Sequence, residues 1–168
     1  MVIKLKKKIN NKVAVVTGAS SGIGKAVALA LLKKGINVYF VGRNKNRLLQ
    51  TEIEAKDKEN QNISLCHTFQ CDVSIEKEVK KLFTAVKKKY NRLDLLFNNA
   101  GIGIVANTID KIKYEDWKKV INVNINGMFL CAKYAYILMK NQKPKGGRII
   151  NNGSISAFSP RPKTAAYT

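Results

Sequence analysis

The 168-residue sequence has few cysteines and one histidine. Cys66, Cys71 and Cys131 have neither CxxC spacing nor the Cys/His spacing of a zinc site, so the sequence indicates no disulfide framework and no metal site. So little cysteine fits a reducing compartment, and we expect a cytoplasmic protein. His67 lies in a strand-like run, and we interpret it as an ordinary strand residue outside any active site. We also expect Asp94 to lie outside the active site.

Long apolar runs are also lacking. No window reaches the length of a membrane span, and residues 1–12 are basic without the apolar run of a signal peptide. We therefore expect no membrane partner and no targeting segment.

Acidic residues are scarce, with 11 Asp and Glu against 31 Lys and Arg, a formal charge of +20. Such a charge raises the hypothesis of nucleic-acid binding. However, 26 of the basic residues are Lys, and they accompany 17 Asn and 17 Ile, a composition typical of an AT-rich coding sequence. No nucleic-acid-reading motif is present, so we expect no nucleic-acid partner. Salt-dependent affinity for DNA or RNA would support that alternative.

Short apolar runs alternate with longer stretches of helical period. Strands are predicted at 13–16, 37–41, 63–70, 93–97 and 148–152, and helices at 23–34, 47–60, 75–90 and 114–139. Strands separated by helices favour parallel pairing through right-handed crossovers. Because there is no linker or repeat, the sequence predicts one α/β domain over residues 1–168, a doubly wound parallel sheet with helices on both faces.

A glycine-rich turn follows the first predicted strand and opens the first helix. Its sequence, from Thr17 to Gly24, has the spacing TGxxxGxG. Glycines let the backbone approach a pyrophosphate, and the helix N-terminus offers unpaired N–H groups with partial positive charge. The predicted dinucleotide-binding residues here are Gly18, Ser20, Ser21, Gly22, Ile23 and Gly24. A plain tight turn between strand and helix is the alternative.

The end of the second predicted strand favours NADP over NAD. An NAD-selecting site places Asp or Glu there against the ribose 2′-hydroxyl. This chain has Gly42 and Arg43, nineteen residues after Gly24. Because a guanidinium binds a 2′-phosphate through charge-assisted hydrogen bonds, we predict contacts from Arg43 and Lys45. An ordinary surface arginine is the alternative.

Four further segments follow in order: Asn98-Asn-Ala-Gly101, Asn122-Val-Asn-Ile-Asn-Gly127, Ser154, and Tyr167 thirteen residues later. Together with TGxxxGxG, they resemble the short-chain dehydrogenase/reductase family over nearly the whole chain. The resemblance implies a Rossmann-type NAD(P)-binding domain and hydride transfer between the nicotinamide and a small carbonyl or alcohol substrate. It also implies a homodimer or homotetramer for a complete member.

The resemblance implies roles for individual residues. Asn98, Asn99, Ala100 and Gly101 would line the cofactor near its ribose, and Asp72 with Val73 would meet the adenine. Asn124 would hold a water at a break in the long helix. Ser154 would hydrogen-bond the substrate oxygen, and Tyr167 would contact the cofactor and exchange the proton.

The family's remaining active-site group is a Lys four residues after the Tyr, which binds the nicotinamide ribose and lowers the phenol pKa. That position lies beyond Thr168. Removing a cation about 5 Å away, at an effective dielectric of about 20, removes roughly 3 kcal/mol of phenolate stabilisation. Lys163 precedes Tyr167 by four residues, but Pro160 and Pro162 favour a loop there.

We therefore expect a fragment of an NADP-dependent oxidoreductase that lacks its C-terminal strands and helices and is inactive alone. A catalytically dead dinucleotide-binding module is the alternative, and binding of the cofactor without turnover would be its mark.

Overall fold

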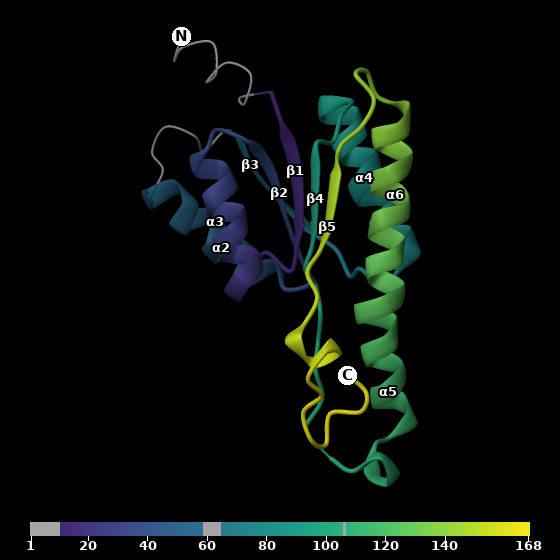
Figure 1. Ribbon diagram of the computed structural model, residues 1–168. Coiled ribbons are helices and arrows are strands. Elements are labelled where there is room, and N and C mark those ends of the chain that lie inside the picture. Colours follow the sequence, from purple (N-terminus) through teal and green to yellow (C-terminus); the bar gives the residue numbers. More distant parts are fainter. Residues whose placement is uncertain (1–10, 59–64, 106) are drawn as a thin grey trace.

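In a computed structural model of the protein, which describes residues 11–58, 65–105 and 107–168, five parallel strands form one sheet (Figure 1). The strands are β1 (Val13–Thr17), β2 (Asn37–Gly42), β3 (Cys66–Gln70), β4 (Leu95–Asn98) and β5 (Arg148–Asn151). Their order in the sheet is β3-β2-β1-β4-β5.

The sheet reverses its winding between β1 and β4. From β1 the chain moves outward to β2 and β3, and then crosses back to β4 and β5 on the other side. β1 pairs in parallel with β2, Val13 opposite Asn37, and with β4, Ala14 opposite Leu95. In an open parallel sheet, such a reversal leaves a crevice at the carboxyl ends of the two strands, which is where ligands bind.

Helices cover both faces of the sheet. One face carries α2 (Gly22–Lys33) and α3 (Lys45–Lys58), and the other carries α4 (Glu76–Tyr90) and α6 (Met128–Asn141) (Figure 1). A further helix, α5 (Tyr114–Ile121), precedes α6. The predicted doubly wound α/β sheet is confirmed.

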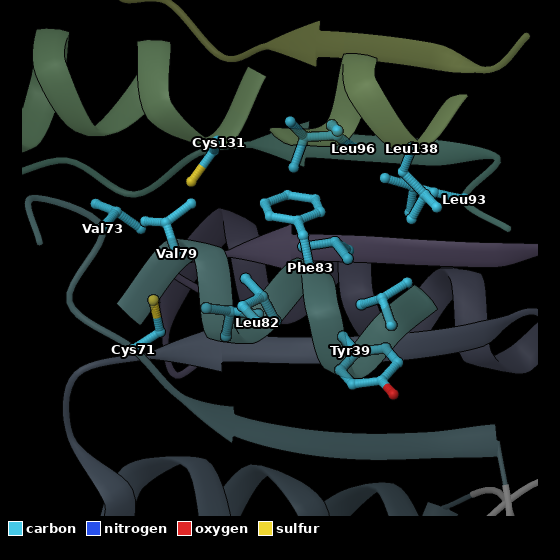
Figure 2. Packing of buried hydrophobic residues seen from close by; sticks show 14 of the residues in the cluster. Tyr39, Cys71, Val73, Val79, Leu82, Phe83, Leu93, Leu96, Cys131 and Leu138 are labelled. Carbon is cyan, nitrogen blue, oxygen red and sulfur yellow. The ribbon is translucent and has the colours of Figure 1, made fainter. Parts of the chain in front are cut away.

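The strand β1 is buried along its whole length and supplies both halves of the core. Successive side chains of a strand point to opposite faces, so Val13 and Val15 pack toward α4 and α6, whereas Ala14 and Val16 pack toward α2 and α3. On the first of these faces Phe83 lies close to Leu96 (Figure 2). Full burial of such a side chain contributes about 2–3 kcal/mol, so this packing fixes the sheet that carries the crevice.

Most predicted boundaries differ from the observed ones by one to three residues, and the clearest differences are in the second half of the chain. The helix predicted at 114–139 is α5, a π-helical segment η3 (Asn122–Gly127) and α6. The strand predicted from residue 93 begins at Leu95 and the one predicted to end at residue 152 ends at Asn151. The basic residues 1–10, the predicted helix end at 60 and strand start at 63–64 lie outside the described residues.

Within the described ranges, no helix has the length and apolar character needed to cross a bilayer. The same ranges contain no group of three His, Cys, Asp or Glu residues arranged to hold a metal ion.

Candidate functional site

A cavity of about 670 Å³ opens at the carboxyl ends of the strands, at the reversal between β1 and β4. Most of the predicted site residues line it, although they come from segments spread over 150 residues of sequence. These lining residues are Gly18, Ser20, Ser21, Gly22, Ile23, Arg43, Val73, Asn99, Ala100, Gly101, Asn124, Ser154 and Tyr167.

Four predicted cofactor residues do not line the cavity: Gly24, Asp72, Asn98 and Lys45. Gly24 is buried beneath the glycine-rich turn, against the backbone of Gly18. Asn98 is 3% exposed, and its amide donates a hydrogen bond of 2.8 Å to the carbonyl of Met128. Asp72 accepts hydrogen bonds from the backbone and hydroxyl of Ser74, in the turn before α4. Gly24 and Asn98 thus contact residues that line the cavity, Gly18 and Met128, and do not line it themselves.

The glycine-rich turn has the shape that a pyrophosphate needs. Gly18 and Gly22 have φ values of +66° and +53°, in the left-handed region that favours glycine. A Cβ on Gly24 would lie 2.3 Å from the carbonyl oxygen of Gly18, so only glycine allows this close approach. The first turn of α2 has no acidic residue and Ser21 makes no side-chain cap, which leaves the helix N-terminus available for an anion. The turn therefore fits a dinucleotide.

Thr17 ties the ends of β1 and β4 together behind the cavity. Its hydroxyl accepts hydrogen bonds from the backbone N–H groups of Asn99 and Ala100, at 2.9 and 3.0 Å. The Asn99 side chain in turn donates to the Thr17 carbonyl and accepts from the Asn152 amide, which follows β5. Thr17 and Asn152 were not predicted as site residues. Their position in the sequence could have indicated a role, since both lie at strand ends next to predicted site residues.

Asn124 holds the loop that follows β4. Its side chain accepts a 2.8 Å hydrogen bond from the backbone N–H of Ile102 and donates a 2.9 Å bond to the carbonyl of the same residue. Asn124 lies in η3, so the break in the long helix that the resemblance implies is a π-helical segment. The amide fixes the loop that forms the cavity wall beside Gly101 and Ile102.

Ser154 and Tyr167 reach the same cavity from the segment after β5. The Ser154 hydroxyl caps a short helical turn, η4 (Ile155–Ala157), by accepting from the backbone N–H of Ser156 at 3.1 Å. Tyr167 is 37% exposed, and its backbone N–H donates to the carbonyl of Thr164. Among the described residues, no side chain hydrogen-bonds the Tyr167 hydroxyl.

A basic group lies at the end of β2. The Arg43 side chain is 56% exposed and lies 3.9 Å from the Asp72 carboxylate. Asn44 and Arg47 also line the cavity here, and the Asn44 side chain accepts from the Arg47 backbone at the start of α3. Arg47 was not predicted as a site residue, although it lies only four residues after Arg43 in the sequence. Lys45 does not line the cavity.

The other lining residues that the sequence analysis missed are mostly apolar or glycine. They are Val41, Gly42, Cys71, Ile102, Gly103, Val123, Met128 and Gly153. Burial raises the pKa of the Cys71 thiol to about 12, and the nearby carboxylates of Glu78 and Asp72 add to the rise. The thiol is therefore protonated at neutral pH and unreactive.

His67 and Asp94 do not line the cavity. His67 is in β3, where its ring lies in hydrogen-bonding distance of the Tyr90 hydroxyl and the Lys89 ammonium. Burial, together with the positive charge of Lys89, lowers the pKa of His67 to about 4. Asp94 forms ion pairs with Lys12 and Arg92 at the opposite, amino edge of the sheet.

Comparison with known families gives a match to the model of the short chain dehydrogenases over residues 12–168. The chain belongs to the short-chain dehydrogenase family. The resemblance found in the sequence is thereby confirmed, and the family's dinucleotide is NAD or NADP.

Individual members of the family are also similar to this chain. A 3beta-hydroxysteroid dehydrogenase of Mediterraneibacter gnavus is 37% identical over 163 residues, which cover 95% of this chain and 55% of that protein. The crystal structure of an NAD+-bound xylitol dehydrogenase superposes with a TM-score of 0.85 at 29% identity, covering 95% of this chain and 59% of the other.

An actinorhodin polyketide ketoreductase variant with NADPH gives the same TM-score, identity and coverages. The chain thus spans little more than half the length of these relatives.

Proposed function

We propose that the chain binds NADP in the cavity at the carboxyl edge of the sheet. We propose further that the whole protein transfers a hydride between this cofactor and a small carbonyl or alcohol substrate. The supporting observation is that one cavity gathers the glycine-rich turn, the segment after β4, Ser154 and Tyr167.

The residues of this chain have distinct tasks in the proposed site. The N–H groups of the turn from Gly18 to Gly24 would hold the pyrophosphate, and the backbone at Ala100 and Gly101 would contact the ribose. Val73 would provide an apolar wall for the adenine. The bound cofactor supplies or accepts the hydride.

Two hydroxyls would act on the substrate. Ser154 would donate a hydrogen bond to the substrate oxygen, which stabilises the charge that develops there. Tyr167 would give a proton to that oxygen in reduction and take it back in oxidation. Both side chains line the cavity that would hold the nicotinamide.

NADP rather than NAD is the proposed cofactor because of the charge at the end of β2. Arg43 and Arg47 both line the cavity there, and the lining residues in the described part of the chain include no Asp or Glu. A guanidinium pairs with the 2′-phosphate of NADP, whereas NAD needs an acceptor for its 2′-hydroxyl.

We propose that the polypeptide of residues 1–168 binds the dinucleotide but shows little turnover. A phenol acts best in proton transfer when a nearby cation brings its pKa toward neutrality. Arg161 and Lys163 line a smaller hollow together with Tyr167, but neither they nor any other described cation hydrogen-bonds its hydroxyl. The same observation favours the second candidate, a dinucleotide-binding module without catalysis.

Fluorescence titration with NADPH and NADH tests the proposal. We expect NADPH to bind at least about tenfold more tightly than NADH, because each charge-assisted hydrogen bond contributes about 1.5–3 kcal/mol. Arg43→Gln should weaken NADPH binding about tenfold and leave NADH binding unchanged. Lys140→Gln, an exposed change on α6, is the matched control for net charge. The assignment of NADP would be refuted if NADH bound more tightly than NADPH, or if Arg43→Gln and Lys140→Gln lost equal affinity for NADPH.

Three further features belong to the same proposal. Residues 1–168 would form a single dinucleotide-binding domain, and the whole protein would be a homo-oligomer without a nucleic-acid partner. A cytoplasmic location agrees with the cysteines, because Cys66, Cys71 and Cys131 are all buried and none is in a disulfide.

A further inference from the structure

A second, smaller hollow of about 290 Å³ lies beside the dinucleotide cavity. The two share Gly103 and Tyr167 in their walls, so the smaller hollow adjoins the proposed reaction centre. Its lining residues are Gly103, Ile104, Ile112, Arg161, Lys163, Thr164 and Tyr167.

The charged residues that line this small hollow are all positive. Arg161 and Lys163 supply two cations, and none of the described residues that line it is acidic. Neither cation forms an ion pair or a side-chain hydrogen bond with any described residue. Elsewhere on the described surface some cations, such as Lys119 and Lys133, are paired with carboxylates, whereas others, such as Lys33 and Lys140, are not. The two cations of the hollow are therefore available for an anionic ligand.

The backbone that carries these cations is held by specific hydrogen bonds. Lys163 has a φ of +61°, a conformation that few non-glycine residues adopt. Its carbonyl accepts a 2.9 Å bond from the backbone N–H of Asn107, in the segment between β4 and α5. The Arg161 carbonyl accepts a 2.6 Å bond from the Thr164 hydroxyl. Strained residues that their surroundings hold in place concentrate at functional sites.

The other wall of the hollow is apolar. Ile104 and Ile112 are both half-buried and line it together with Gly103. A ligand that fits this space has a short carbon skeleton against the isoleucines and a polar end at the cations. The Tyr167 side chain lies at the junction with the larger cavity, where the reacting carbon would be.

We propose that the substrate carries an anionic oxygen group, a carboxylate or a phosphate, which Arg161 and Lys163 bind while its carbonyl or alcohol carbon lies at Tyr167. This assignment rests on the proposed function, since that function puts the reaction at Tyr167. A net charge of +20 adds a long-range attraction for any anion. What distinguishes these two cations from others on the surface is that they line a hollow together with Tyr167.

The test compares ligands that differ in charge but hardly in shape. Acetoacetate and acetoacetamide differ by a carboxylate oxygen and an amide nitrogen, and dihydroxyacetone phosphate and dihydroxyacetone differ by the phosphate. Binding to the isotopically labelled chain is followed by NMR through the backbone amides of Thr164 and Tyr167. We expect at least one anionic probe to bind about tenfold more tightly than its neutral partner, and the preferred pair identifies the anion class.

Variants of Arg161 and Lys163 test whether these two cations cause the preference for the anionic probe. Arg161→Gln and Lys163→Gln should each weaken binding of the anionic probe about fivefold. The double variant should bind the anionic and the neutral probe equally. Lys163→Asn provides a second variant at that position, because Asn tolerates positive φ better than most residues. Lys140→Gln again controls for net charge. Equal binding of charged and neutral probes to the unmodified chain, or a preference that survives the double variant, would overturn the assignment.

Titration with NADPH separates this assignment from the proposed function. Both cations lie outside the dinucleotide cavity lining, so the double variant should bind NADPH as the unmodified chain does. If the anion preference depends on the two cations but NADPH does not bind, the anion site stands and the dinucleotide function falls. If NADPH binds but the probes do not differ, the dinucleotide function stands and the anion site falls.

Discussion

Substitution of Gly24 by alanine tests the packing under the proposed pyrophosphate site, because two physical effects there have opposite signs. Gly24 lies in the first turn of α2, where helix propensity alone would make alanine about 1 kcal/mol more favourable. The added Cβ would lie 2.3 Å from the Gly18 carbonyl oxygen and 2.6 Å from the Asn99 amide. Overpacking of this kind costs up to about 3 kcal/mol, so the net effect is a loss of about 2 kcal/mol.

Urea denaturation followed by circular dichroism measures that loss. For a chain of this size, about 2 kcal/mol also lowers the melting temperature by about 4–8 °C. Since relief of the clash moves Gly18 or Asn99, which both line the cavity, NADPH binding should weaken as well.

Two controls accompany Gly24→Ala. Ala30→Gly, at an exposed position of α2, measures the propensity effect by itself and should cost about 1 kcal/mol. Gly153→Ala adds a methyl group where nothing lies within 4 Å and should leave stability nearly unchanged. If Gly24→Ala is as stable as the unmodified chain or more so, the close approach does not constrain the turn, and the packing argument is wrong.

Three other changes have measurable outcomes. Asn124→Ala removes both side-chain hydrogen bonds to Ile102 and should cost about 2–3 kcal/mol in urea denaturation, whereas Asn124→Asp keeps the acceptor and should cost less.

Gln142→Ala should cost a similar amount, because its buried amide bonds both the N–H and the carbonyl of Leu93; a loss below about 0.5 kcal/mol would contradict this.

The pKa of His67 is lowered from an ordinary 6.5 to about 4, so the unfolded chain takes up this proton at a higher pH than the folded chain does. Stability is therefore complete above pH 6.5 and falls toward pH 4, and because the side chain is only half-buried, solvent screening limits the loss to about 1–2 kcal/mol. His67→Gln should flatten that part of the pH profile, and an unchanged slope would show that other groups cause it.

Much of the fold could be predicted from local patterns. Runs such as 13–16 and 37–41 are apolar throughout, which is typical of strands buried on both faces, and β1 and β2 are buried along their whole length. Boundaries were less certain where local and tertiary effects compete. The periodicity of 114–139 predicts a single α-helix, but the segment around Asn124 is π-helical, where its side chain bonds the loop after β4.

The candidate site could be predicted in part, because many of its residues come directly after a strand in the sequence. The glycine-rich turn, Asn99–Gly101 and Ser154 were predicted to meet the cofactor or the substrate, and the structure puts them around one cavity. Asn98 and Asp72 show the limit of that approach. Both were expected to line the cofactor, yet the cavity lining includes neither, since one bonds to Met128 and the other to Ser74.

The sequence by itself determined the alternation of strands and helices, the position of the glycine-rich turn and the spacing of Ser154 and Tyr167, because each depends on residues that are neighbours along the chain. Only the tertiary structure decided which residues far apart in the sequence contact one another. Thr17 contacts Asn99 over 82 residues, and Lys163 is held by the loop at Asn107. Such contacts depend on how the strands pair and how the loops fold back over the sheet edge, and a local pattern of residue types does not specify them.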